Sequence, residues 1–213
     1  MAKTMTPSKT ATAPQIDKAV ANYRALLEKH SGEFDAEAVQ TVLGQSELAG
    51  EQFSVFRRRV EAVSNLIVRR VMVNRNRTQQ EALDATAREQ YVDRKVVDNM
   101  PKGEGEEVEV VFFKPDLSKR NGFISDDDLE KEFELRGLEP ADPISVAAVN
   151  EADPSFADEK PHGTHWKNAD GKWCFATFYC VNDERSVLVN RYDFVWLGSW
   201  WFAGRRKVLS ALS

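Results

Sequence analysis

Two histidines and two cysteines in the last third of the chain are the side chains best suited to metal or nucleophilic chemistry. His162 and His165 stand three residues apart, and Cys174 and Cys180 follow in the next apolar segment. Imidazole and thiolate are ligands that zinc prefers, so His162, His165 and Cys174 form a candidate metal site. Cys174 with His165 is also a candidate nucleophile–base pair. Against both, the two cysteines would lie about 20 Å apart along one regular strand, and buried cysteines commonly pack as small apolar side chains. We therefore predict no metal site, no cofactor and no catalytic residue.

Residues 122–129 resemble the second half of a calcium-binding EF-hand loop. A glycine, an isoleucine two residues later and an acidic residue six residues later have the spacing of that motif. The first half departs from it, because Leu117 and Lys119 stand at the first and third positions, where carboxylates are required. The sequence favours instead a helix over 126–136, capped by Ser125 and carrying three aspartates in its first turn.

The strongest charge feature is a run of arginines between residues 57 and 77. Seven arginines stand against one acid, Glu61, which gives a local charge of +6 in a chain whose net charge is −5. Guanidinium groups bind both carboxylates and phosphates. Three interpretations stay open: pairing with carboxylates such as those of segment 126–134, within the chain or across a dimer; binding of a nucleic acid; and simple solvation. The nucleic-acid interpretation uses Arg57, Arg58, Arg59, Arg69, Arg70, Arg75 and Arg77.

The composition is that of an ordinary globular chain. Its 213 residues, 42% apolar and 30% charged, suffice to bury a core. No apolar run approaches the length of about 18 residues that suggests a membrane-spanning helix, and residues 1–14 lack the apolar stretch of a secretory signal. Two cysteines suit a reducing compartment, which predicts a cytoplasmic location. The absence of a Walker loop, a dinucleotide-binding glycine motif and a zinc-protease helix argues against an enzyme.

Apolar residues recur at helical spacing through the first half of the chain. We expect a disordered tail over 1–14 and then a helical region over 15–100, with about four helices near 16–30, 35–44, 51–74 and 78–100. Thr78 and Glu81 form a capping box at the start of the fourth. The third has the three-and-four spacing of a seam packed on other helices. Its seam comprises Phe53, Phe56, Val60, Val63, Ile67 and Val71.

The second half has the pattern of an α+β domain. A Gly- and Glu-rich linker at 101–106 precedes this domain, which covers 107–213 and begins with strands at 108–113 and 144–149 around the helix at 126–136. An antiparallel meander follows at 164–167, 172–181 and 186–197, with turns at Asp170-Gly171 and 182–185. We expect the tryptophans of this C-terminal region to form its core. They are Trp166, Trp173, Trp196, Trp200 and Trp201.

The sequence as a whole favours a non-enzymatic interaction or regulatory protein, with nucleic-acid binding as the alternative. Tryptophan and arginine dominate the energetic centres of protein interfaces. If the aromatic residues near the C-terminus are exposed, they form an anchor for another protein or for a second copy of this chain, with no membrane involved. The predicted partner-binding residues are Trp200, Trp201, Phe202, Arg205 and Arg206.

Overall fold

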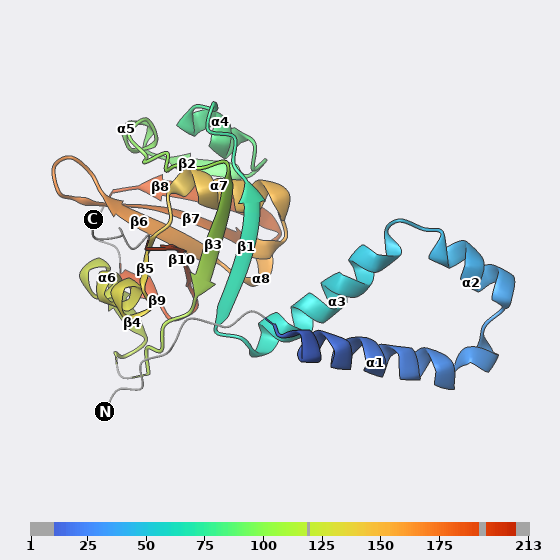
Figure 1. Ribbon diagram of the computed structural model, residues 1–213. Coiled ribbons are helices and arrows are strands. Elements are labelled where there is room, and N and C mark those ends of the chain that lie inside the picture. Colours follow the sequence, from blue (N-terminus) through green and yellow to red (C-terminus); the bar gives the residue numbers. More distant parts are fainter. Residues whose placement is uncertain (1–10, 119, 192–194, 208–213) are drawn as a thin grey trace, which may run out of the picture. The chain divides into compact units, whose positions relative to one another are not determined.

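The computed structural model describes residues 11–118, 120–191 and 195–207 (Figure 1). The chain divides into two compact units, Met1–Ser64 and Asn65–Ser213. The described part of the first unit is helical, and the second combines helices with a mostly antiparallel sheet. The predicted mixed α+β class is therefore confirmed, whereas residues 1–10 of the predicted tail lie outside the described residues.

The first unit is a series of helices: α1 (Ala13–Lys29), a 3-10 turn (Ser31–Glu33), α2 (Ala36–Leu43) and α3 (Leu48–Val63). The backbone N–H of Thr12 donates to the side chain of Gln15 at 2.8 Å, which closes the first turn of α1. Asp35 caps α2, since its carboxylate accepts from the N–H of Ala38 at 2.9 Å. These local signals explain why the helices predicted at 16–30 and 35–44 are present.

The second unit is built on an eight-stranded sheet with the order β1-β3-β10-β6-β7-β8-β2, in which β5 pairs beside β10. Neighbours are antiparallel except for β10 with β6 and β2 with β8. Two further strands, β4 (Phe123–Ser125) and β9 (Val195–Leu197), form a separate antiparallel pair. The strands of the main sheet are β1 (Leu66–Met72), β2 (Glu89–Val92), β3 (Glu107–Phe113), β5 (Leu138–Pro140), β6 (His162–Lys167), β7 (Trp173–Val181), β8 (Glu184–Asn190) and β10 (Trp201–Arg206).

Helices cover the sheet, and the sheet separates two hydrophobic cores. Alternate residues of β3 enter different cores, because successive side chains of a strand point to opposite faces. Phe112 packs in the core that α7 covers, and Phe113 packs with Trp196 and the side chains of α6. The helices of this unit are α4 (Gln79–Asp84), α5 (Arg94–Val97), α6 (Asp126–Leu135), α7 (Pro143–Ala152) and α8 (Phe156–Glu159).

The segment predicted as one helix over 51–74 is divided between two elements. Helix α3 ends at Val63, and residues 66–72 form β1, which is antiparallel to β3. Ile67 and Val71 share a buried face of this strand instead of a helical seam. The error has a physical reason: residues four apart lie on one side of a strand as well as of a helix, and this segment is rich in β-branched side chains.

The segment predicted as a helix over 78–100 contains α4, β2 and α5. Its predicted start is confirmed, since Thr78 accepts from the N–H of Glu81 and the Glu81 side chain accepts in return. The predicted linker at 101–106 is a loop inside the second unit, because the boundary between the units lies at Ser64.

Residues 144–149 form part of α7 and not the predicted strand. Asp142 caps this helix by accepting from the N–H of Ser145 at 2.9 Å, and Pro143 occupies its first turn. Every residue from 143 to 150 is buried. The helix therefore has no polar face from which its period could be recognised in the sequence.

The predicted strand at 108–113, the helix at 126–136 and the first hairpin of the meander are confirmed as β3, α6 and β6–β7. The Asn168 side chain accepts two backbone N–H groups across that hairpin turn, and Gly171 adopts a φ of +73°. The second turn is tight, with positive φ at Asn182 and Asp183. The predicted strand at 186–197 contains β8 and β9, and its residues 192–194 lie outside the described residues.

Candidate functional site

A buried polar centre of the second unit surrounds His165 on β6. Helix α6 begins with Asp126 and presents Glu130 one turn later, so both carboxylates reach the ring. His165 Nδ1 lies 2.7 Å from Asp126 Oδ1, and Nε2 lies 3.0 Å from Glu130 Oε1. Trp196 Nε1 donates to the same Asp126 oxygen at 2.9 Å. The Trp173 ring stacks on the imidazole with their centroids 4.4 Å apart.

These contacts favour the protonated form of His165. Burial opposes the charge, but the hydrogen bond to Asp126 and the carboxylate of Glu130 outweigh it and raise the pKa of His165 above its ordinary value. A protonated imidazole has no lone pair for a metal or for base catalysis. We interpret this centre as a charged clamp that holds the first turn of α6 against β6. It borders a cleft of about 420 Å³ that Lys167 and Arg205 also line.

His162 has the opposite environment, because it stands three residues before His165 and points to the other face of the sheet. Its ring is packed among Phe112, Phe156 and Phe178. Nδ1 lies 2.7 Å from the carbonyl oxygen of Lys160, and Nε2 lies 2.9 Å from the amide nitrogen of Asn150. Burial lowers the pKa of His162 to about 3, so this ring is neutral and donates through Nδ1.

The candidate metal site and the candidate nucleophile are not assembled. His162 and His165 occupy opposite faces, and Cys174 is buried on β7 in the core that contains His162. Within the described residues, no cluster of three or more His, Cys, Asp or Glu side chains is arranged to hold a metal ion. Burial also raises the pKa of the Cys174 thiol, which disfavours the thiolate that a nucleophile needs. Cys174 and Cys180 are both free thiols.

Four of the seven arginines form ion pairs inside the second unit. Their partners belong to β3, to α7 and to the residues that flank α7, and none belongs to the acidic segment 126–134. Arg69 also lies over the ring of Phe156, 4.3 Å from its centroid. The pairs are Arg69–Asp153 (4.0 Å), Arg70–Glu109 (3.2 Å), Arg75–Asp142 (2.8 Å) and Arg77–Glu151 (2.6 Å).

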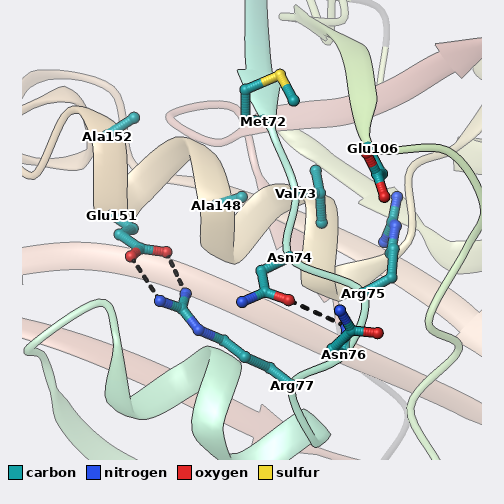
Figure 2. A pocket seen from close by; sticks show the side chains of 10 residues that line it. All are labelled: Met72, Val73, Asn74, Arg75, Asn76, Arg77, Glu106, Ala148, Glu151 and Ala152. Atoms are coloured by element: carbon teal, nitrogen blue, oxygen red, sulfur yellow. Dashed lines mark hydrogen bonds and ion pairs between the residues drawn. The ribbon is translucent and has the colours of Figure 1, made fainter.

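The turn after β1 lines a cleft of about 530 Å³ opposite α7. Figure 2 shows Arg77 extended toward Glu151 of α7, which accepts from both terminal guanidinium nitrogens, at 2.6 and 3.1 Å. Asn74 folds over the same turn and accepts from the N–H of Asn76 at 3.1 Å. The guanidinium groups of Arg75 and Arg77 both border this cleft, and both are already bound to carboxylates, which weakens the case for a phosphate there.

Arg75 fixes the loop at 102–105. Its guanidinium donates to the carbonyl oxygen of Gly105 at 2.9 Å and to the Ser145 hydroxyl at 2.8 Å, besides its ion pair with Asp142. Further carbonyl groups of Lys102 and Glu104 accept from the same side chain. One arginine thus joins the turn after β1, the loop and the start of α7, which explains why the predicted linker is an ordered part of the second unit.

The remaining three arginines lie on α3. The guanidinium of Arg57 lies over the ring of Phe53, 4.6 Å from its centroid, while Arg58 and Arg59 are exposed. The predicted arginine helix of residues 57–77 does not exist as one element, because β1 begins at Leu66. The α3 arginines and the four paired ones therefore belong to different units.

The predicted partner-binding segment near the C-terminus is part of the sheet. Trp201 and Phe202 are 6% and 0% exposed, which leaves Trp200 as the half-buried aromatic residue of the three. Arg205 pairs with a carboxylate of β5 at 2.7 Å, and Arg206 pairs with one of β3 at 3.0 Å. The segment is not an exposed anchor, because β10 pairs with β3, β5 and β6 and its aromatic side chains fill both cores.

The first unit carries the large exposed apolar surface that the C-terminal segment lacks. No residue of α1, α2 or α3 is buried. The sequence signal for this surface is the helical spacing itself, which is equally typical of a core seam. The exposed apolar residues are Ile16, Val20, Tyr23, Leu26 and Leu27 of α1, Phe34, Val39, Val42 and Leu43 of α2 and its flank, and Phe53, Val55, Phe56, Val60 and Val63 of α3.

No described helix combines the length and the apolar character needed to cross a membrane. Comparison of the chain with protein-family models, with curated proteins and with solved structures finds no match.

Proposed function

We propose that this chain is a non-enzymatic interaction protein whose N-terminal helices bind another macromolecule or another copy of the chain. The observation that carries the proposal is the uncovered apolar side of α1, α2 and α3, in which no residue is buried. Contiguous apolar surfaces of this kind mark interaction sites on soluble proteins.

The stability of these helices supports the same conclusion. The three helices contain 17, 8 and 16 residues. Helices shorter than about 12–15 residues are marginal in water, which applies to α2, and helices of any length in proteins draw most of their stability from packing an apolar face. Within the first unit nothing is packed on these faces, and a bound partner would supply the missing core.

The polar centres of the second unit favour binding over catalysis. His165 is held by two carboxylates, and His162 is a neutral side chain inside a core of phenylalanines. The thiol of Cys174 is buried and its pKa is raised. Each of these residues is accounted for by packing or ion pairing, and we assign no chemical step to them.

The proposal is tested by cross-linking in cells that express the tagged full chain, followed by mass spectrometry. Val60 and Val55 of α3 provide a matched pair of substitutions, since they are 47% and 53% exposed. Val60 lies in the seam, and Val55 lies about 120° around the helix from the centre of the seam. We expect cross-links to α1 and α3 in the wild type and in Val55→Glu, and their loss in Val60→Glu. Equal cross-linking of all three proteins would contradict the proposal.

The same purification examines the nucleic-acid alternative. A nucleic acid bound through Arg57, Arg58 and Arg59 would co-purify at low salt, raise the absorbance at 260 nm and dissociate as salt increases. Binding of a nucleic acid would also be retained in Val60→Glu, because contacts to phosphates do not need the apolar seam. Binding with this salt dependence would favour the alternative over an apolar partner.

A further inference from the structure

We infer that the occupant of the apolar seams is a second copy of this chain, with α1 of one copy packed against α3 of the other. The inference rests on the proposed function and names its partner. The residues concerned form two seams, one on each helix. The α1 seam is Ile16, Val20, Tyr23 and Leu27, and the α3 seam is Phe53, Phe56, Val60 and Val63.

Both seams have the spacing of a coiled coil. The α1 residues are separated by four, three and four positions, and the α3 residues by three, four and three. An apolar repeat that averages 3.5 residues keeps one stripe of a helix facing a partner helix along its whole length. A helix that packs on an irregular surface has no need of this regularity. The occupant we expect is therefore another helix with a matching seam.

The two helices match each other in length. They contain 17 and 16 residues, which correspond to about 25 and 24 Å. In a twofold dimer, α1 of each copy meets α3 of the other, so the two seams of one chain are both covered by the same contact repeated twice. A second copy thus supplies two seams of the required spacing and length.

The exposed area is sufficient for a stable dimer. The eight seam side chains are between 46% and 87% exposed. At roughly 200 Å² for a large side chain, they leave on the order of 800 Å² per copy open to solvent. This is about the area that each partner buries in an interface of standard size.

Packing of the two seams on each other within one chain does not remove this surface. Helices α1 and α3 are joined by a hydrogen bond of 2.7 Å between Gln52 Nε2 and the Tyr23 hydroxyl. That contact uses the polar end of a seam residue, while the Tyr23 side chain and the rest of both seams stay exposed. The packing of α1 and α3 within the first unit therefore leaves the apolar surface available to the second copy.

The test measures the mass of the purified full chain by sedimentation between 0.1 and 100 μM. We expect a concentration-dependent dimer for the wild type and for Val55→Glu. In Val60→Glu, a charge enters the seam twice per dimer, and we expect the dissociation constant to rise at least ~100-fold. Far-ultraviolet circular dichroism checks that the helices of the first unit still form in each variant. Tryptophan fluorescence checks only the second unit, because all five tryptophans lie there.

A second measurement locates the contact. Cross-linking an equal mixture of ¹⁴N- and ¹⁵N-labelled chains should give mixed-isotope peptides that join α1 to α3. A wild type that is monomeric at 100 μM, or a dimer that survives Val60→Glu, would overturn the inference. If the purified chain is monomeric but cells still give seam-dependent cross-links to another macromolecule, self-association fails and the proposed function stands. A purified chain that is monomeric, together with an absence of seam-dependent cross-links in cells, would refute both the dimer and the proposed function.

Discussion

Acid should destabilise the second unit through one residue, His162, before its carboxylates titrate. The neutral ring is buried among aromatic side chains, and burial lowers its pKa to about 3 in the folded state. An unfolded chain restores a histidine pKa of about 6.5. The folded state thus binds fewer protons than the unfolded state between these values, and its stability falls as the pH falls from 6.5 toward 3.

The magnitude follows from the same two values. Each pH unit below 6.5 removes about 1.36 kcal/mol, so acidification from pH 7 to pH 5 should lower the free energy of unfolding by about 2 kcal/mol. The carboxylates with lowered pKa, such as Glu109 and Asp128, contribute mainly below about pH 5, because their unfolded pKa values are near 4. Between pH 6.5 and pH 5, the change in the free energy of unfolding therefore comes mainly from His162.

The assay is urea unfolding followed by tryptophan fluorescence, which reports on the second unit, at several pH values from 5 to 8. The comparison is between the slopes of the wild type and of His162→Gln, which is less stable overall but has no proton to bind at this position. We expect the decrease below pH 6.5 to disappear in His162→Gln and to persist in the control His165→Gln. An equal slope in the wild type and in His162→Gln would refute the assignment of a buried neutral ring.

Three further predictions concern the surrounding structure. The pKa of His165 is raised in the folded state, so its stabilising charge is fully present below about pH 6.5 and is lost as the pH rises through the folded pKa. In urea unfolding, the difference in free energy of unfolding between the wild type and His165→Gln should therefore narrow at alkaline pH. Gly163→Ala should destabilise by about 1–3 kcal/mol in urea unfolding, since an added Cβ would stand 3.0 Å from the Ala176 carbonyl oxygen and from the Trp196 ring. Arg75→Lys cannot reproduce the planar set of donors and should speed hydrogen exchange in residues 102–105. Unchanged exchange there would contradict the role of Arg75 in holding the loop.

The elements that the sequence predicted well are those with local chemical signals at both ends. Ser125 accepts from the N–H of Asp128, and α6 begins where the capping signal placed it. The hairpin between β6 and β7 likewise follows from Asn168 and Gly171, whose conformations fix the turn. Such signals need no tertiary context, because the interactions that define them lie within a few residues.

The elements that the sequence misassigned depend on distant contacts. The seam of α3 continues in register into Ile67 and Val71, so apolar spacing alone does not mark the change from helix to strand. Pairing with β3 determines that residues 66–72 form a strand. Asp142-Pro143 is a local signal for the start of α7, but the buried helix that follows has no polar face to support it.

The candidate sites also depend on contacts between residues that are distant in the sequence. The ring environments of His162 and His165 depend on α6, α7 and β6 meeting in space, which no spacing along the chain reveals. The condition for an aromatic anchor, exposure of residues 200–202, is not met at Trp201 and Phe202, because composition identifies apolar residues but not which of them the sheet covers. The apolar seam of the first unit was visible in the sequence, whereas its exposure was not.

The place of β10 in the sheet has a consequence for synthesis on the ribosome. β10 is the final strand that the structure describes, yet it lies between β3 and β6. Neither of these strands can therefore pair with β10 until residues 201–206 have left the exit tunnel. Until then the nascent chain holds two partial sheets with open edges, which are templates for wrong pairing with other chains. Ribosome stalling just before this strand should therefore yield a product that chaperones retain or proteases remove.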